Sequence, residues 1–213
     1  MTTNAPPTNR AKMPDEPRRN TRLPASNTGS EEALTEGNAD SLAAAVSACQ
    51  AGDRAAQRQV FDACHESVYR LAVRMVGSQD AADVTQQAFL QAFRSIGQYR
   101  GESRFTTWLY RLAVNESLQH LRRDRRSRHV PLEREPVDSA RHEQNEERKE
   151  LLDKALSDID PELRSIFLLR EVEELSYREI AEALQIPAGT VGSRLNRARR
   201  ELQKRLSDLG WDE

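Results

Sequence analysis

Hydrophobic positions repeat every three or four residues near the C-terminal end of the sequence. Ser176, followed by Glu179, has the spacing of a capping box and predicts the start of a helix. Pro187 and Gly189 then predict a break. After the break, Thr190 is expected to cap a second helix with one apolar stripe, formed by Val191, Leu195, Ala198, Leu202 and Leu206. The pattern predicts two helices joined by a tight turn.

The second of these helices has a basic outer face. At about 100° per residue, the side opposite the apolar stripe carries Ser193, Asn196, Arg197, Arg200 and Lys204, flanked by Arg194 and Arg199. Between Thr190 and Arg205 there are six basic residues and one acidic residue, Glu201. This pattern is typical of a helix-turn-helix that reads the DNA major groove. The alternative is an amphipathic helix whose charges are merely solvated.

Helical periodicity also fills the middle of the chain. A short helix is expected from Ser41 to Ala51, and a long one from a cap at Asp53 to a stop at Gly77. A third helix is expected from Asp80 to Ile96, and a fourth from about Phe105 to Arg126. No stretch alternates in the manner of a β-strand. The sequence therefore predicts an all-α fold.

Composition divides the chain into two small helical domains joined by a flexible acidic linker. Residues 1–38 hold five of the nine prolines and few large aliphatic residues, which predicts a disordered extension. The predicted domains are 39–127 and 148–208, with the linker at 128–147 and a tail at 209–213. The second domain is expected to begin near Arg148, with a capped helix at Asp160 and Pro161.

The third helix predicts a candidate protein-docking surface. Its buried side is expected to hold Val84, Ala88, Phe89, Phe93 and Ile96. Its other side carries polar residues with one large aliphatic residue among them: Asp80, Asp83, Gln87, Gln91 and Arg94, with Gln86 at the margin and Leu90 in their midst. Such a leucine indicates a docking surface. A single exposed leucine is also ordinary, and the residues alone leave both interpretations open.

The fourth helix predicts a candidate surface for unpaired bases. A wide apolar arc leaves one narrow polar stripe, formed by Trp108, Arg111, Asn115, Gln119, Arg122 and Arg126. An aromatic ring, amides and positive charge together suit single-stranded nucleic acid. The alternative is a partly buried tryptophan beside solvated arginines.

Charge and composition narrow the function. The net charge of −2 hides a basic stretch from Arg94 to Arg128, with nine basic and three acidic residues, and an acidic stretch from Glu133 to Glu150, with seven acidic and four basic residues. The two cysteines form no CxxC pair, and no signal peptide or membrane-length apolar run is found. A soluble cytoplasmic protein is expected. No catalytic, metal-ligating or cofactor-binding constellation appears, so no enzyme activity, cofactor or metal is expected.

Two stretches resemble a known family. DAADVTQQAFLQAF and YRGESRFTTWLYRLAVN, within residues 80–123, resemble region 2 of bacterial sigma-70-type factors. The run PELRSIFLLREVEELSYREIAEALQIPAGTVGSRLNRARREL resembles their region 4. With no region 3 between them, the chain resembles an extracytoplasmic-function (ECF, group 4) sigma factor over about residues 40–207. The resemblance implies binding to the RNA polymerase core, through the β′ clamp helices and the β flap, recognition of promoter DNA, strand opening, and control by an anti-sigma factor.

The resemblance also implies roles for particular residues. Docking on the clamp helices would involve Asp80, Asp83, Gln86, Gln87 and Phe89, although a glutamate is usual at position 87, and the helix pattern adds Leu90 to this set. The loop with Tyr99, Arg100, Arg104 and Phe105 would hold a flipped −10 base and Asn115 would read the −10 element, and the polar stripe of the fourth helix adds Trp108, Arg111, Gln119 and Arg122. The −35 element would be read by Ser193, Asn196 and Arg197, and the face of the same helix adds Thr190, Arg194 and Arg200. Gly192 stands where an arginine or lysine is common, so one −35 contact is in doubt.

Two other classes of function stay open at this point. A stand-alone helix-turn-helix regulator would bind specific duplex DNA without polymerase. A helical adaptor protein would show no salt-dependent binding to DNA at all.

Overall fold

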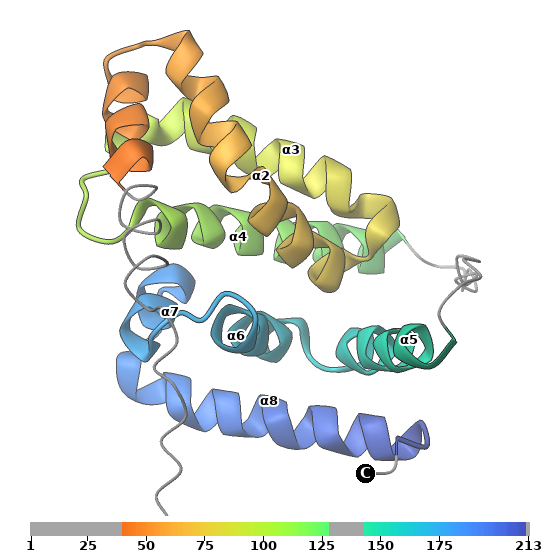
Figure 1. Ribbon diagram of the computed structural model, residues 1–213. Helices are drawn as coiled ribbons and strands as arrows, with labels where there is room; N and C mark the ends of the chain where they lie inside the picture. Colours follow the sequence, from red (N-terminus) through yellow and green to blue (C-terminus); the bar gives the residue numbers. More distant parts are fainter. Residues whose placement is uncertain (1–39, 128–142, 212–213) are drawn as a thin grey trace, which may run out of the picture. The chain divides into compact units, whose positions relative to one another are not determined.

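The computed structural model describes residues 40–127 and 143–211, with side chains in the second range from Arg148 onward (Figure 1). All regular structure in these two ranges is helical, which confirms the predicted all-α class. The predicted disordered extension and most of the predicted linker lie outside the described residues. The described residues belong to one compact unit.

The first group of helices comprises a helix over residues 40–50, α2 (Arg54–Val76), α3 (Ser78–Ser95), the short 3₁₀ helix η1 (Ile96–Gln98) and α4 (Phe105–Ser127). Asp53 caps α2 as predicted, because its side chain accepts hydrogen bonds from the N–H groups of Ala55 and Ala56. The helices α2, α3 and α4 all contact one another. Their shared core is built from fully buried aliphatic residues, including Val60, Val68, Leu71, Met75, Leu109 and Val114.

Gly77 alone separates α2 from α3. Its φ of 92° lies in the left-handed region that glycine adopts without strain. Its N–H donates to the carbonyl of Val73 at 2.8 Å, and its carbonyl accepts from Ala81 at 3.1 Å. One residue therefore ends one helix and begins the next, and α3 starts at Ser78, two residues before the predicted Asp80.

The second group comprises α5 (Glu143–Asp158), α6 (Pro161–Glu171), α7 (Tyr177–Leu184) and α8 (Ala188–Asp208). Asp160 caps α6 by accepting from the N–H groups of Glu162 and Leu163, as predicted. The α5 helix begins at Glu143, five residues before the predicted Arg148. Its first turns are charged and lack an apolar repeat, so the sequence pattern gave no signal there.

The helix-turn-helix consists of α7 and α8. The Ser176–Glu179 capping box is present, and Gln185 ends α7 with a φ of 54°. The predicted cap at Thr190 is wrong, since α8 begins at Ala188 directly after Pro187. Proline has a fixed φ and here an extended ψ of 134°, so the chain enters the helix without a side-chain cap. Thr190 lies in the first turn instead, and its N–H donates to the carbonyl of Pro187 at 2.8 Å.

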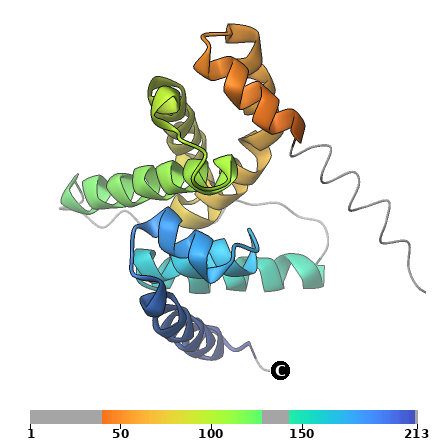
Figure 2. The same cartoon turned by 90° about the vertical axis from the view of Figure 1, so that its left-hand side faces the viewer.

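The two groups pack against each other. Helix α4 contacts α6 and α7, while α2 contacts α5 and α6, and buried residues of both groups form one hydrophobic cluster (Figures 1 and 2). Polar contacts also cross this seam. Arg164 of α6 donates to the carbonyl of Met75 in α2 at 2.6 Å, and the hydroxyl of Tyr110 in α4 is hydrogen-bonded to the carboxylate of Glu173.

Arg164 is the most buried charged residue of the described chain, with 5% of its surface exposed. Besides the Met75 carbonyl, its guanidinium reaches the carbonyl of Ser157 at 2.6 Å and that of Ile159 at 3.4 Å. These carbonyls belong to the C-terminal end of α5 and the turn after it, and Met75 lies at the C-terminal end of α2. A cation there interacts favourably with the helix dipoles.

We expect Arg164→Met to lower the free energy of unfolding by about 2–4 kcal/mol, because buried carbonyls at two helix ends lose a charged donor. The matched control is Arg58→Met, which removes an exposed ion pair to Asp62 and should change stability by less than about 1 kcal/mol. Urea unfolding followed by circular dichroism measures both. Equal effects of the two substitutions would contradict the structural role of Arg164.

Candidate nucleic-acid interface

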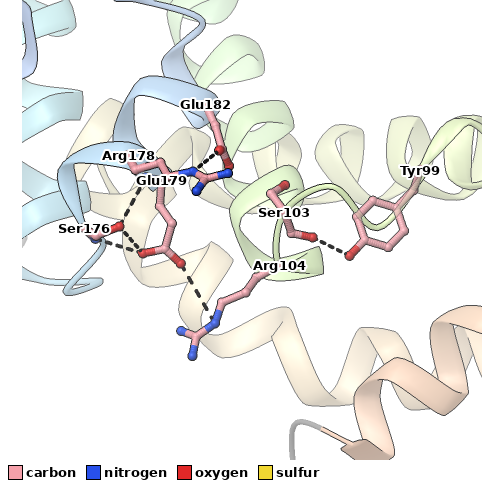
Figure 3. Close-up of polar contacts among 7 residues, drawn as sticks. All are labelled: Tyr99, Ser103, Arg104, Ser176, Arg178, Glu179 and Glu182. Atoms are coloured by element: carbon pink, nitrogen blue, oxygen red, sulfur yellow. Dashed lines mark hydrogen bonds and ion pairs between the residues drawn. The ribbon is translucent and has the colours of Figure 1, made fainter. Parts of the chain in front are cut away.

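The loop between η1 and α4 is closed on itself. The hydroxyl of Tyr99 donates to the carbonyl of Ser103 at 2.7 Å, as Figure 3 shows. The Tyr99 ring meets Phe105 edge-on at a centroid distance of 5.4 Å, and Trp108 at 5.6 Å. The loop over residues 99–104 is therefore held by one hydrogen bond across it and by aromatic packing on the first turn of α4.

A cavity of about 390 Å³ opens beside this loop. Its lining includes Tyr99, Arg100, Trp108 and Arg111, all of which the sequence assigned to the −10 surface. Arg178 and Glu182 of α7 line the same cavity and form an ion pair with each other at 3.0 Å (Figure 3). Sequence reasoning missed this contribution of α7, because no periodic pattern shows which helix of one group faces the other.

Trp108 follows the alternative interpretation, a buried tryptophan. The polar stripe of α4 favoured a surface position, but only 8% of its surface is exposed. The reason is that the loop folds back over the start of α4, where Trp108 packs against Tyr99 and Phe105. Phe105, at 6% exposed, is likewise largely buried. Trp108 thus borders the cavity as part of its aromatic wall rather than as a free platform.

The rest of the α4 stripe is accessible to different degrees. Asn115 and Gln119 are exposed, and Arg111 is half-buried. Arg104, just before the helix, lies 3.9 Å from the carboxylate of Glu179 in α7 (Figure 3). Arg122 lies 3.7 Å from Glu162 in α6. In this arrangement, carboxylates of the second group of helices face the basic side chains of α4.

The outer face of α8 is accessible as predicted. Ser193, Asn196, Arg197 and Arg200 are exposed, and Thr190 is half-buried. The guanidinium of Arg197 is hydrogen-bonded to Glu201 at 2.8 Å, which raises its pKa. Two other arginines of α8 pair with α6: Arg194 with Glu162 at 3.9 Å, and Arg199 with Glu171 at 2.6 Å.

Most residues assigned to the predicted docking surface are accessible on α3. Asp83, Gln86 and Gln87 are exposed around Leu90, which is 40% exposed. Asp80 is half-buried, and its carboxylate lies 3.2 Å from the imidazole Nε2 of His120. Phe89 is only 3% exposed and packs against Phe61 and Phe93, so its side chain belongs to the core. The sequence placed Phe89 both on the buried side of the third helix and among the docking residues, and the structure shows it buried.

No group of histidine, cysteine and carboxylate side chains suited to a metal ion occurs in 40–127 or 148–211. Within the helices that are described, none has the length and apolar content needed to cross a membrane. Cys49 and Cys64 are both buried and unpaired, and burial raises the pKa of Cys64 to about 11.

Family models and relatives identify the chain. Residues 60–127 match the model for sigma-70 region 2, and residues 149–202 match a model for sigma-70 region 4. An RNA polymerase sigma-H factor of Pseudomonas aeruginosa is 36% identical over 77% of this chain and 93% of its own length. The ECF RNA polymerase sigma-E factors of Haemophilus influenzae and Escherichia coli are each 34% identical, over 78% and 77% of this chain and 95% and 93% of their own lengths. The chain belongs to the sigma-70 family, as an ECF sigma factor: a non-enzymatic protein of transcription initiation.

Solved structures agree with this fold. The structure of CnrH in complex with the cytosolic domain of CnrY is similar at a TM-score of 0.62 and 20% identity, over 82% of this chain and 99% of that one. The sigma factor RpoE of Bartonella quintana, in complex with the anti-sigma factor NepR, is similar at a TM-score of 0.58 and 21% identity, over 70% of this chain and 96% of that one.

The Tyr110–Glu173 contact leads to a prediction about pH. Burial, and then the hydrogen bond to the Glu173 carboxylate, raise the pKa of Tyr110. Above about pH 10 an unfolded tyrosine loses its proton whereas the folded protein keeps the proton of Tyr110, so the folded state loses relative stability as pH rises. We expect the free energy of unfolding to fall more steeply above about pH 10 in the wild type than in Tyr110→Phe.

Urea unfolding at a series of pH values measures this difference. Cys64 contributes its own loss of stability over a similar range, but it does so in both proteins and cancels in the comparison. Tyr177→Phe is the matched control, because it removes a phenolic hydroxyl from an exposed tyrosine. Parallel curves for the wild type and Tyr110→Phe would contradict the prediction.

Proposed function

We propose that this ECF sigma factor binds the core of RNA polymerase through α3 and recognises two promoter elements, the −35 element through α8 and the −10 element through α4 and the loop over residues 99–104. The observation that carries the proposal is that polar or basic faces stay accessible on both groups of helices. The exposed positions of α8 are supported by a helix-turn-helix, and the cavity beside Tyr99 lies at the start of α4.

The −35 contacts follow from the outer face of α8. Asn196 offers an amide that suits adenine, and Arg197 and Arg200 suit guanine or phosphate. Thr190, Ser193 and Arg194 lie in the N-terminal half of the helix, where a recognition helix approaches base edges. Gly192 places no side chain there, and a Cβ atom at this position would meet the ring of Tyr177 at 3.5 Å, an ordinary van der Waals contact.

The −10 contacts follow from the cavity and the exposed stripe beyond it. A flipped base would enter the cavity between Arg100 and Arg111 and meet the aromatic wall formed by Tyr99 and Trp108. Asn115 and Gln119 would meet the bases next to it, while Arg104 and Arg122 would contact phosphates after leaving Glu179 and Glu162. Phe105 would act by supporting Tyr99.

The docking surface on α3 would meet the polymerase clamp helices through Asp80, Asp83, Gln86, Gln87 and Leu90. An anti-sigma factor is a further proposed partner. It is supported by the structural neighbours, one of which is named as a complex with an anti-sigma factor. A partner that covered Leu90 would prevent polymerase binding by direct competition.

Run-off transcription with core RNA polymerase tests the proposal, followed by sequencing of the promoters that are selected from a randomised library. The expected result is transcription that needs both proteins and enriches two spaced elements. Tight specific binding of the isolated protein to duplex DNA, without any effect on core polymerase, would instead favour a stand-alone regulator. Absence of salt-dependent DNA binding in the holoenzyme would favour an adaptor.

We expect Leu90→Arg to weaken binding to core polymerase without unfolding the protein, because Leu90 is exposed and contributes little to the core. A buried leucine at an interface contributes about 1.5–3 kcal/mol, so the dissociation constant should rise by at least about tenfold. The control is Gln59→Arg, which also introduces a positive charge but does so at an exposed position of α2. Circular dichroism checks folding; normal polymerase affinity in a folded Leu90→Arg protein would contradict the docking surface.

We expect Arg197→Ala to reduce discrimination between the selected −35 sequence and its single-base variants by about 1–3 kcal/mol, with core binding intact. Arg205→Ala, an exposed charge in the last turn of α8, is the matched control. If Arg197 contacts only phosphate, its loss will weaken binding to all sequences alike. The slope of the logarithm of the DNA-binding constant against the logarithm of salt concentration will then fall in magnitude by about one. That pattern would remove Arg197 from the base-reading residues.

A further inference from the structure

Gln50 lies at the end of the helix over residues 40–50, before the segment that matches the sigma-70 region 2 model. Its side chain reaches a distant part of the chain, where η1 passes into the loop over residues 99–104. The Gln50 amide nitrogen Nε2 donates to the carbonyl of Tyr99 at 2.7 Å and to the carbonyl of Ile96 at 3.0 Å. One amide group therefore contacts both ends of the turn that leads into the loop.

The chemistry of this contact requires a donor. Both partners are backbone carbonyls, so the amide can satisfy them only with its NH₂ group. The Ile96 carbonyl also accepts the N–H of Tyr99 at 3.1 Å, so Gln50 binds a turn that is already hydrogen-bonded within itself. A carboxylate at this position would place oxygen against oxygen.

The main chain at Gln50 is fixed in place. Ala45, Val46 and Cys49 of the same helix are buried in the core. The helix ends in a tight turn, in which Gly52 has a φ of 93° and Asp53 N–H donates to the carbonyl of Ala48 at 3.0 Å. Gln50 therefore projects from a packed helix onto the turn at the start of this loop.

The anchored residue is the one that shapes the cavity. Tyr99 lines the cavity, and its hydroxyl closes the loop through Ser103. Arg100, whose position follows directly from the backbone of Tyr99, also lines it and is exposed. A shift of the Tyr99 carbonyl would move the aromatic wall and the guanidinium together.

We propose that Gln50 is a positioning residue for base recognition at the −10 element: by clasping the carbonyls of Ile96 and Tyr99 it fixes the shape of the cavity that receives the flipped base. This inference rests on the proposed function of that cavity. Gln50 itself would not contact the base, and its effect would appear as base preference rather than as affinity for polymerase.

The test compares three variants in the full-length protein. Gln50→Glu keeps the size of the side chain and removes its donors, while Gln50→Lys keeps a donor and should restore the contact in part. Gln59→Glu makes the same chemical change at an exposed position of α2 and controls for the added charge. Arg100→Ala tests the cavity independently, because it removes a lining side chain and leaves the Gln50 contacts in place.

Two measurements are made on each variant. Hydrogen exchange of peptides that cover residues 96–104 reports the loop in the free protein, where neither DNA nor polymerase is involved. Transcription by the reconstituted holoenzyme from templates pre-melted across the −10 element, with each of the four bases at the flipped position, reports base preference. Melting temperature and polymerase affinity are recorded alongside.

Gln50→Glu should speed exchange in the loop and reduce the preference for the favoured base, each by roughly 2- to 10-fold, as expected for the loss of neutral hydrogen bonds. For both the exchange rate and the base preference, Gln50→Lys should give values between those of Gln50→Glu and the wild type. Gln59→Glu should match the wild type in both. Unchanged exchange in Gln50→Glu would overturn the proposal. The proposal would also be overturned if Gln50→Glu speeds exchange but leaves base preference unchanged while Arg100→Ala alters that preference.

The proposed function can fail separately. If Arg100→Ala leaves base preference unchanged, the cavity does not read the base, and the inference about recognition falls with it. In that case, faster exchange in Gln50→Glu would still establish the contact between Gln50 and the loop.

Discussion

The burial of one guanidinium fixes how the two groups of helices meet. Arg164 lies where the C-terminal ends of α2 and α5 come together, and its hydrogen bonds at 2.6 Å satisfy a carbonyl from each side. Removing a charge from water is costly, and this cost is offset only when the geometry supplies acceptors and favourable dipoles. Few orientations of α6 meet that condition. Since α6 leads directly into the helix-turn-helix, the position of Arg164 also determines where α7 and α8 lie relative to α4.

The remaining polar contacts across the seam differ in strength. The hydroxyl of Tyr110 and the carboxylate of Glu173 are largely removed from water, and the other carboxylate oxygen of Glu173 is buried with no hydrogen-bond partner among the described residues. Whether such a buried polar pair stabilises the fold depends strongly on its hydrogen-bond geometry. The pairs Arg104–Glu179 and Arg122–Glu162 are more exposed and longer, at 3.9 and 3.7 Å. Exposed ion pairs contribute about 0–1 kcal/mol to the free energy of unfolding, and salt weakens them. Buried apolar surface and the two buried polar contacts therefore hold the seam.

The parts of this structure that the sequence predicted are those with a local cause. Capping residues, a proline before a helix and a regular apolar stripe act within a few residues, and Asp53, Asp160, Ser176 and the stripe of α8 were read correctly. The cap misplaced at Thr190 has a local cause, Pro187, whereas the errors at the candidate site have distant causes. Trp108 is buried because a loop folds over it, and α7 borders the cavity because Arg164 and Tyr110 bring the two groups together. Gln50 gave no sequence signal at all, since its partners are carbonyls more than forty residues away and any residue type supplies a carbonyl.

The weakness of the exposed pairs has a consequence for the proposed DNA contacts. Arg104 and Arg122 are held near carboxylates, and a phosphate that approached either one would replace one oxygen anion with another. Since an exposed ion pair contributes little, that exchange costs little, and the release of counterions from DNA favours it. Arg164 differs from these exposed arginines, because it is buried and donates hydrogen bonds to backbone carbonyls inside the seam. The basic groups proposed to hold DNA are thus exposed and can exchange a carboxylate for a phosphate, while the guanidinium that binds the seam is removed from solvent.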